Sequence, residues 1–204
     1  MNEKDYDELL HIQTEGNKHE VNDSIYYHPY EPTPYSALEC LFKEYEMSEQ
    51  DCIVDFGCGK GRLNFYLHYL FHSRVTGIEM NETFYREALE NKERYLMKLK
   101  CDPRTIQFHY CKAEQYEILP EENKFYFFNP FSIQIFMRVV NNILRSFEAV
   151  NRDMDIILYY ASDEYRYFLE YQTSFELIKE IEIPVLNEKN AFERFLIYRL
   201  RKEW

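Results

Sequence analysis

Residues 51–62 read DCIVDFGCGKGR, and this stretch decides how the rest of the chain is organised. The apolar, β-branched run at its start predicts a strand that is buried on both faces. Gly57, Gly59 and Gly61 follow in alternate positions and predict a tight turn, because glycine adopts positive φ and lets a ligand approach the backbone. Apolar side chains over residues 63–71 predict a helix. Strand, glycine turn and helix together open a βα nucleotide-binding unit.

The residues around the glycines indicate which ligand this turn binds. The dinucleotide-binding pattern needs a third glycine at position 62, where this chain has Arg62, and the phosphate-loop pattern G-x-x-x-x-G-K-[ST] has no match here. Asp55 lies two positions before Gly57. A carboxylate so close to the turn repels a pyrophosphate but attracts a ligand with an ammonium or sulfonium group. S-adenosylmethionine carries both groups.

A second acid, Glu79, favours the same ligand. It ends a short apolar strand predicted over residues 74–79 and lies 22 positions after Gly57. A carboxylate about 20 residues beyond the glycine turn, at the end of the second strand, is placed to accept hydrogen bonds from both hydroxyls of an adenosine ribose. Each acid alone is compatible with a solvated side chain, whereas the pair at this spacing is a specific pattern.

Through residues 54–62 (VDFGCGKGR) and 77–79 (GIE), the chain resembles the class I S-adenosylmethionine-dependent methyltransferases. The resemblance covers roughly residues 30–204. It implies an α/β, Rossmann-like fold, with a seven-stranded, mostly parallel sheet, an antiparallel last strand and helices on both faces. Apolar runs over residues 106–111, 124–128, 155–160, 175–183 and 192–200 supply the remaining strands.

The resemblance also implies a cofactor site at the carboxyl ends of the first strands. The residues assigned to it are Asp55, Gly57, Cys58, Gly59, Gly61, Glu79, Ala113 and Glu114. The family usually has an acid and a small residue that hold the adenine, whereas this chain keeps the small Ala113 and has its acid at Glu114. Cys58 is either a reactive thiol or a small residue tolerated in the turn.

The methyl acceptor is predicted to meet the segment Asn129-Pro130-Phe131, which follows the strand over residues 124–128. This segment resembles a shortened (N/D)-P-P-(Y/F) motif of amino-methyltransferases. In that motif a side-chain oxygen and a proline carbonyl accept hydrogen bonds from the target amine, and the aromatic ring flanks it. The resemblance makes Asn129, Pro130 and Phe131 the catalytic candidates. The alternative is an Asn-Pro turn that closes the strand and places Phe131 in the core.

Residues 1–34 are expected to form an acidic, tyrosine-rich cover over a domain formed by residues 35–204. The first 50 residues hold 12 acidic side chains against three lysines. Prolines at positions 29, 32 and 34 predict an extended segment. The resemblance implies that this segment covers the cofactor and substrate, with Tyr30, Tyr35 and Tyr159 lining the substrate pocket. Packing of these tyrosines against the domain is the alternative.

Composition restricts the partners. In the 204 residues, a hydrophobic fraction of 46% and an aromatic fraction of 18% argue against disorder. The net charge of -12 disfavours nucleic acid and anionic membranes as partners. Five cysteines without a C-x-x-C pair, and histidines without metal-ligand spacing, indicate reduced thiols and no metal. The N-terminus lacks the layout of a signal peptide, so a cytoplasmic location is expected.

The sequence therefore predicts a methyltransferase that uses S-adenosylmethionine and N-methylates a small molecule or a protein side chain. The alternative is a regulatory or interaction module that binds the cofactor without turnover, because its cofactor residues would look the same. An NAD-dependent oxidoreductase is a third possibility, but its dinucleotide would have to bind despite Asp55 and the missing third glycine. The acceptor and the oligomeric state are left open.

Overall fold

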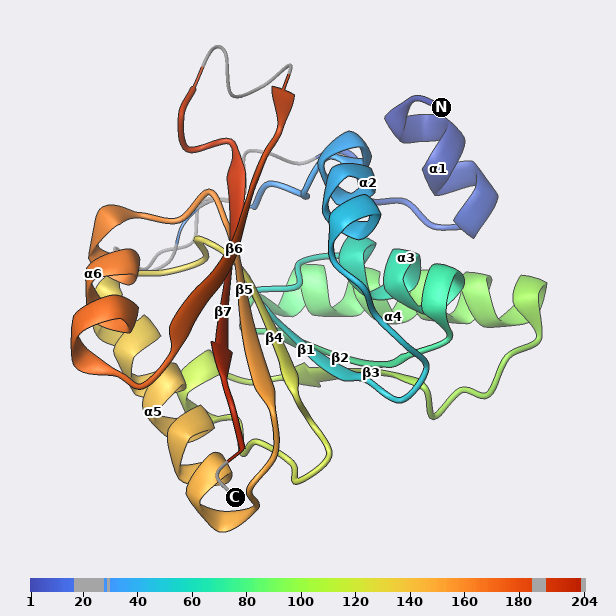
Figure 1. Ribbon diagram of the computed structural model, residues 1–204. Coiled ribbons are helices and arrows are strands. Elements are labelled where there is room, and N and C mark those ends of the chain that lie inside the picture. Colours follow the sequence, from blue (N-terminus) through green and yellow to red (C-terminus); the bar gives the residue numbers. More distant parts are fainter. Residues whose placement is uncertain (17–27, 29, 185–189, 203–204) are drawn as a thin grey trace.

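The computed structural model describes residues 1–16, 28, 30–184 and 190–202 of the chain. Helices lie on both faces of a central sheet (Figure 1). The strands are β1 (Cys52–Phe56), β2 (Arg74–Glu79), β3 (Ile106–Tyr110), β4 (Lys124–Phe128), β5 (Met154–Tyr159), β6 (Glu176–Glu182) and β7 (Arg194–Leu200). The helices are α1 (Glu3–Leu10), α2 (Tyr35–Glu44), α3 (Arg62–Phe71), α4 (Glu82–Leu99), α5 (Ile133–Ala149) and α6 (Asp163–Gln172), with a short 3-10 turn η1 (Ala113–Gln115).

The strand order of the sheet is β3-β2-β1-β4-β5-β7-β6. Strands β1 to β5 pair in parallel, and β7 enters between β5 and β6, antiparallel to both. The predicted seven-stranded sheet with its antiparallel last strand is thereby confirmed. All five residues of β1 are buried, as expected for a parallel strand covered on both faces.

Two hydrophobic clusters hold the helices against the sheet. One face of the sheet packs against α1, α2, α3 and α4, and the other packs against α5 and α6. The sequence of α5 favours a helix because its apolar side chains recur at helical spacing and form one buried stripe. They are Ile135, Phe136, Val139, Val140 and Ile143.

The first part of the predicted cover is anchored to the domain. Helix α1 opens with a capping box formed by Asn2 and Asp5. The buried Asp7 carboxylate then accepts bonds from the backbone N–H and hydroxyl of Thr14, and the Nε of Arg62 donates to that hydroxyl at 2.7 Å. Residues 17–27 and 29 of the predicted cover lie outside the described residues.

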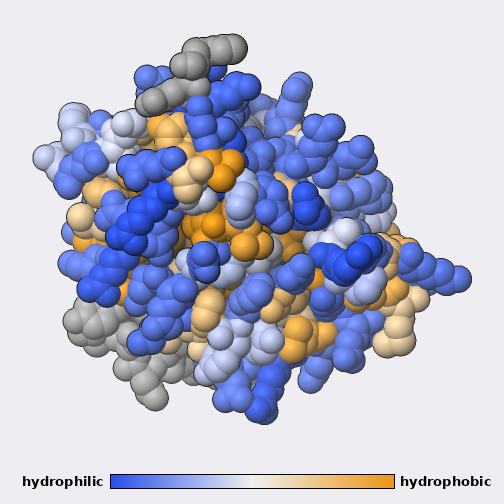
Figure 2. Space-filling model, turned by 90° about the horizontal axis from the view of Figure 1, so that it is seen from below, coloured by the Kyte–Doolittle hydropathy of each residue, from blue (hydrophilic) through white to orange (hydrophobic). Residues whose placement is uncertain are grey.

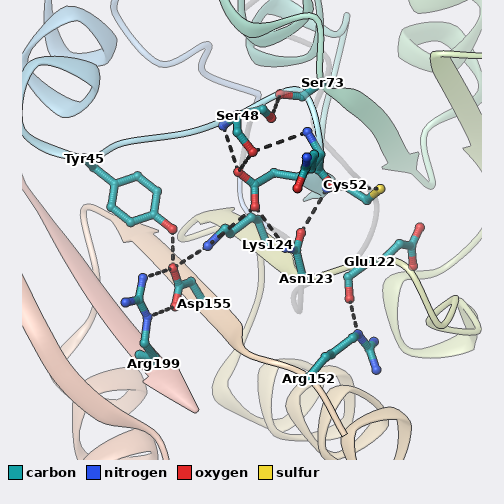
Figure 3. A network of polar contacts seen from close by, with 12 residues as sticks. Tyr45, Ser48, Cys52, Ser73, Glu122, Asn123, Lys124, Arg152, Asp155 and Arg199 are labelled. Atoms are coloured by element: carbon teal, nitrogen blue, oxygen red, sulfur yellow. Dashed lines mark hydrogen bonds and ion pairs between the residues drawn. The ribbon is translucent and has the colours of Figure 1, made fainter. Parts of the chain in front are cut away.

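A polar network crosses the end of the sheet at which β1, β4 and β5 begin (Figure 3). The fully buried Asp155 accepts bonds from Lys124 at 2.7 Å, from Arg199 at 2.7 and 2.8 Å, and from the hydroxyl of Tyr45. Burial alone would raise the pKa of Asp155, but Arg199, Lys124 and Tyr45 hold that pKa below its ordinary value. Seen from this end, the surface is mostly hydrophilic, with hydrophobic side chains gathered near its middle (Figure 2). The network ties three strands together at the end opposite the glycine turn.

Candidate active site

The glycine turn connects β1 to α3 through backbone in the left-handed region. Gly57, Gly59 and Gly61 have φ of 80°, 54° and 85°. The N–H groups of Gly57 and Cys58 donate to the carbonyl oxygen of Ile78, at 2.9 and 3.1 Å, so the turn is fixed to the end of β2. Glycine is required here by both backbone conformation and space. A Cβ added at Gly59 would lie 2.1 Å from the ring of Tyr30.

Cys58 is a packing residue of this turn. Its sulfur lies 2.6 Å from the position that a Cβ on Gly77 would take, so the thiol is seated on β2. Burial, followed by the charges of Asp55 and Glu79, raises the pKa of Cys58 well above its ordinary value. A thiol with a raised pKa forms little thiolate and is therefore unreactive.

Glu79 ends β2 beside the turn, where it was predicted to bind a ribose. Its carboxylate accepts a 2.9 Å bond from the N–H of Gly59 and a 2.7 Å bond from the N–H of Asn81. The side chain is 7% exposed. Burial raises the pKa of Glu79, and the backbone donors partly oppose that rise. The carboxylate is held rigidly, and each oxygen keeps acceptor capacity for a ligand.

Asp55 is the unusual group of the site. It is 4% exposed, and no described residue donates a hydrogen bond to its carboxylate. Burial, followed by the charge of Glu79, raises the pKa of Asp55 well above its ordinary value. The nearby cations are engaged elsewhere, since Lys60 pairs with Glu87 at 2.7 Å and Arg62 pairs with Glu3. A buried carboxylate without a compensating cation favours a ligand that brings a positive charge.

A cavity of about 60 Å³, with Glu79 but not Asp55 in its wall, lies at the end of β4. Its walls include Gly57, Glu79 and Ala113, which the sequence assigned to the cofactor. They also include four residues that sequence reasoning missed: Ile78, Met80, Phe84 and Cys111. These four carry little chemistry of their own and follow no motif, so only the packing of β2, α4 and β3 places them there.

Glu114 is not among the residues that line this cavity. Its backbone oxygen accepts a bond from the side chain of Asn142 on α5 at 3.0 Å, which holds η1 against that helix. The short 3-10 turn presents Ala113 to the cavity, and the role of Glu114 beside the adenine stays a prediction.

Tyr30 fills much of the space above the glycine turn. Its hydroxyl donates to the backbone oxygen of Thr14 at 2.9 Å, and its ring lies 4.7 Å from that of Phe84. Small-molecule sites usually measure about 300–1,000 Å³, well above the 60 Å³ beside this ring. The acids and the glycine turn fit S-adenosylmethionine, and its full entry requires the ring of Tyr30 to move.

Tyr35 is a core residue, which corrects its assignment to the substrate pocket. It is fully buried in the first turn of α2. Its ring stacks on that of Tyr6 at 4.5 Å, and its hydroxyl donates to Asp7 at 2.8 Å. The guanidinium of Arg62 lies 4.6 Å from the ring centre. The first turn of α2 packs inward, so Tyr35 joins α2 to α1 and α3.

A second cavity, of about 430 Å³, adjoins the first, and Tyr30 and Phe128 line both. Two other predicted residues, Asn129 and Tyr159, line it as well. Asn129 follows β4 with a φ of 39°, and its Oδ1 is buried without a hydrogen-bond partner in the described structure. A non-glycine residue with strained backbone and an unsatisfied acceptor is typical of a binding site.

The three residues of the predicted acceptor motif have different surroundings. The carbonyl of Pro130 accepts a 3.0 Å bond from the N–H of His28, and a His28 ring nitrogen lies 2.5 Å from the carbonyl oxygen of Asn129. Phe131 is only 1% exposed, with its ring 6.1 Å from that of Phe127 in an edge-on contact. Phe131 therefore packs in the core and, with Pro130, also lines the smaller cavity, so its role at the acceptor stays a prediction. Only Asn129 of the three offers a buried, unused acceptor.

The described parts of the chain contain no group of three His, Cys, Asp or Glu side chains that could hold a metal ion. None of the helices described is long and apolar enough to span a membrane.

Comparison with known proteins gives matches to methyltransferases. Residues 34–126 match a protein family described as "Methyltransferase domain". A protein-lysine N-methyltransferase from Saccharolobus islandicus is 34% identical over 67 residues, which are 32% of this chain and 42% of that protein. The chain thus matches less than half of that relative's length.

Two solved structures share the whole architecture. A putative RNA methyltransferase from Pyrococcus horikoshii has a TM-score of 0.60 at 21% identity and covers 98% of each chain. An RNA methyltransferase from Salinibacter ruber, solved with S-adenosylhomocysteine, has a TM-score of 0.53 at 19% identity and covers 85% of this chain and 95% of that one. The strand order, the antiparallel β7 and the glycine turn define the class I methyltransferase fold. The chain therefore has the class I methyltransferase fold, and the family match over residues 34–126 covers a little under half of it.

Proposed function

We propose that the protein binds S-adenosylmethionine and transfers its methyl group to a nitrogen atom of a small molecule or a protein side chain. The observation that carries the proposal is the pair of buried carboxylates, Asp55 and Glu79, on either side of the glycine turn. A dinucleotide or phosphate would bring negative charge to these acids, whereas this cofactor brings an ammonium and a sulfonium.

Each part of the proposed site has a role in holding the cofactor. Asp55 and the backbone of the glycine turn bind the methionine end, Glu79 binds the ribose, and Ala113 lies beside the adenine. When bound, the cofactor supplies a methyl group activated by a positively charged sulfur. The chain's own task is to align the acceptor with that group, which can lower the barrier by about 7–11 kcal/mol without a strong acid or base.

Asn129 is the residue proposed to orient the acceptor nitrogen. Its Oδ1 is buried, unpaired within the described structure, and belongs to the wall of the larger cavity. Accepting a hydrogen bond from an amine N–H fixes the direction of the nitrogen lone pair. The carbonyl of Pro130 has the same role in the related motif, and here it already accepts one bond from the N–H of His28, which leaves its second lone pair for an amine.

The N-terminal segment is proposed to cover the site, and a protein substrate is proposed beside a small molecule. Tyr30 over Gly59 and His28 on Pro130 support the cover. The protein-lysine specificity of the Saccharolobus islandicus relative supports the protein substrate. The five free cysteines support a reducing, cytoplasmic location.

Transfer of a labelled methyl group tests the proposal. Cell extract is incubated with the purified protein and S-adenosylmethionine labelled in its methyl group, beside the Asn129→Ala variant. Incorporation that falls at least about tenfold in the variant supports an enzyme with Asn129 at the acceptor. Tight cofactor binding without incorporation into any extract indicates the binding module instead. A protein that is stabilised against heat by NAD and not by S-adenosylmethionine contradicts the proposal.

A further inference from the structure

The larger cavity carries a chemical signature that identifies the group it binds. It is formed where β4 and β5 end and where the chain enters β7. Phe128 is the last residue of β4, Tyr159 is the last of β5, and Glu193 immediately precedes β7. Because β7 runs antiparallel to β5, its first residues return to the same edge of the sheet. Residues far apart in sequence therefore meet at the methyl-transfer end of the fold.

Three aromatic rings form adjoining walls of this cavity. The ring of Phe128 lies 4.7 Å from that of Tyr159 and 6.3 Å from that of Tyr160, and the two tyrosine rings lie 6.5 Å apart. Their planes are inclined to one another by 56°, 60° and 68°. Tyr160 has a φ of 54°, which is an unfavourable backbone conformation for a tyrosine. Asn190 donates a 2.6 Å bond to its hydroxyl and holds the ring in place. The three rings therefore border a common space, and Tyr159 is backed by Phe195, whose ring stacks on it at 4.6 Å.

The charged side chains of the cavity are acidic. Glu31 and Glu193 both line it, and no described lysine or arginine does. Arg194, the neighbour of Glu193, is paired with Glu180 at 2.8 Å. The hydroxyl of Tyr159 donates to Glu193. Burial and the charge of Glu193 raise the pKa of Tyr159, so this tyrosine stays protonated and fixes the carboxylate as an acceptor.

We infer that this cavity binds an aliphatic amine as its ammonium ion, between the three rings and the two carboxylates, with Asn129 Oδ1 as a further acceptor. Aromatic faces and carboxylates both attract a cation, and an apolar wall suits the alkyl chain that bears it. A phosphate-bearing or carboxylate-bearing acceptor would be repelled by Glu31 and Glu193. The inference rests on the proposed methyl transfer only in making this amine the acceptor. For that step the ammonium first gives up a proton to a cavity carboxylate or to water. The neutral nitrogen then takes the methyl group as the bond from the methyl carbon to sulfur breaks and S-adenosylhomocysteine leaves.

The ammonium can come from a protein lysine side chain or from a free alkylamine, and the cavity recognises what the two share. The first experiment needs no cofactor. The full-length protein is titrated with n-butylammonium chloride, with 1-pentanol as a neutral analogue and with pentanoate as an anionic one, by NMR or calorimetry. We expect n-butylammonium to bind at least about tenfold more tightly than either analogue.

Two variants assign the binding to this cavity. Glu193→Gln keeps the acceptor for Tyr159 and removes the charge, and should weaken n-butylammonium binding by about tenfold. Phe128→Leu keeps an apolar side chain and removes one π face, and should weaken it severalfold. Glu180→Gln makes the same charge change just outside the cavity and should leave binding unaltered. Thermal melting checks that each variant is folded. Equal affinity for 1-pentanol, or unchanged affinity in Glu193→Gln, overturns the inference.

A methyl-transfer assay distinguishes a free amine from a protein lysine as the source of the ammonium group. Label from S-adenosylmethionine is offered together with spermidine, and separately with extract proteins. Label that co-migrates with methylated spermidine after chromatography, apart from unreacted cofactor, identifies free amines. Acid-precipitable label on lysine identifies proteins, and label only on other groups overturns the inference. Binding of S-adenosylhomocysteine is measured in parallel. If n-butylammonium binds selectively but S-adenosylhomocysteine does not bind, the proposed function alone is refuted. If S-adenosylhomocysteine binds but the amine shows no selectivity over its analogues, the inference alone is refuted.

Discussion

Replacing Asp55 by asparagine should stabilise the ligand-free protein while it weakens cofactor binding. The side chains have nearly the same shape, so the substitution removes the charge and little else. In the folded protein the carboxylate is 4% exposed, lacks a hydrogen-bond donor among the described residues and lies near the buried Glu79. A group in such surroundings destabilises the empty fold whenever it is ionised.

The direction of the pH dependence follows from the raised pKa of Asp55. Above the ordinary value of 3.8, the unfolded chain has released this proton while the folded chain still holds it. The folded state then binds more protons, so the free energy of unfolding falls as pH rises toward the folded pKa. Each unit of the rise corresponds to about 1.4 kcal/mol. We expect Asp55→Asn to be more stable than wild type by at least about 1 kcal/mol at pH 7 and equally stable near pH 4.

Ligand binding should change in the opposite sense. The ammonium group of S-adenosylhomocysteine would meet a charged partner in wild type and a neutral amide in the variant. A hydrogen bond to a charged group contributes about 1.5–3 kcal/mol, which corresponds to a loss of affinity of about 10- to 150-fold. In wild type, binding should also release a proton at acidic pH, because the ligand favours the ionised carboxylate, and the variant should lose this release.

Urea unfolding at a series of pH values and calorimetry in two buffers measure these effects. Asp163→Asn makes the same change at a side chain that is 81% exposed, and should alter neither the pH profile nor binding. A loss of stability of about 1 kcal/mol or more in Asp55→Asn at pH 7 would show that the carboxylate has a stabilising partner, and would refute the reasoning. Unchanged affinity for S-adenosylhomocysteine would remove Asp55 from the site.

Three further perturbations address the turn, its cover and the polar network. Gly59→Ala should destabilise the protein by more than the roughly 1–2 kcal/mol of left-handed strain and abolish S-adenosylhomocysteine binding. Gly16→Ala, at a positive φ and with no described atom within 4 Å of the new Cβ, should cost only the strain; equal losses in urea unfolding would contradict the close approach. Tyr30→Ala should tighten S-adenosylhomocysteine binding, because the ligand no longer has to displace the ring. The gain is about tenfold for each 1.4 kcal/mol that this displacement costs in wild type. Weaker binding of the variant in calorimetry would show that the ring belongs to the ligand site. Lys124→Met should lower the free energy of unfolding by about 3 kcal/mol, because it leaves Asp155 without one of its two cations, and a loss below about 1 kcal/mol would show that Arg199 suffices.

Local sequence was sufficient for the part of the fold that one segment determines. The buried strand, the glycine turn and the acid at the end of β2 follow from residues 51–79 alone, because glycine conformation and strand burial are local requirements. The antiparallel entry of β7 followed from the family resemblance and is confirmed by its pairing with β5.

The rest of the site depends on contacts between distant segments. Tyr35 looked like Tyr30 in the sequence, yet the phase of α2 turns it toward Asp7 and into the core. Phe131 packs on Phe127 because the chain bends inward after Pro130. Glu193 has no neighbouring motif, and only the return of β7 beside β5 carries it to the larger cavity.

Titration of S-adenosylhomocysteine into wild type and Glu79→Gln, followed by calorimetry, tests most directly whether the buried acids form a cofactor site. Gly59 and Asn81 donate to different oxygens of Glu79, so Glu79→Gln keeps an acceptor for one of the two N–H groups, and thermal melting checks that the variant stays folded. We expect saturable binding with one ligand per chain in wild type, weakened by about 10- to 150-fold in the variant. Absent binding in wild type, or equal affinity in the two proteins, would contradict the assignment of this end of the sheet to S-adenosylmethionine.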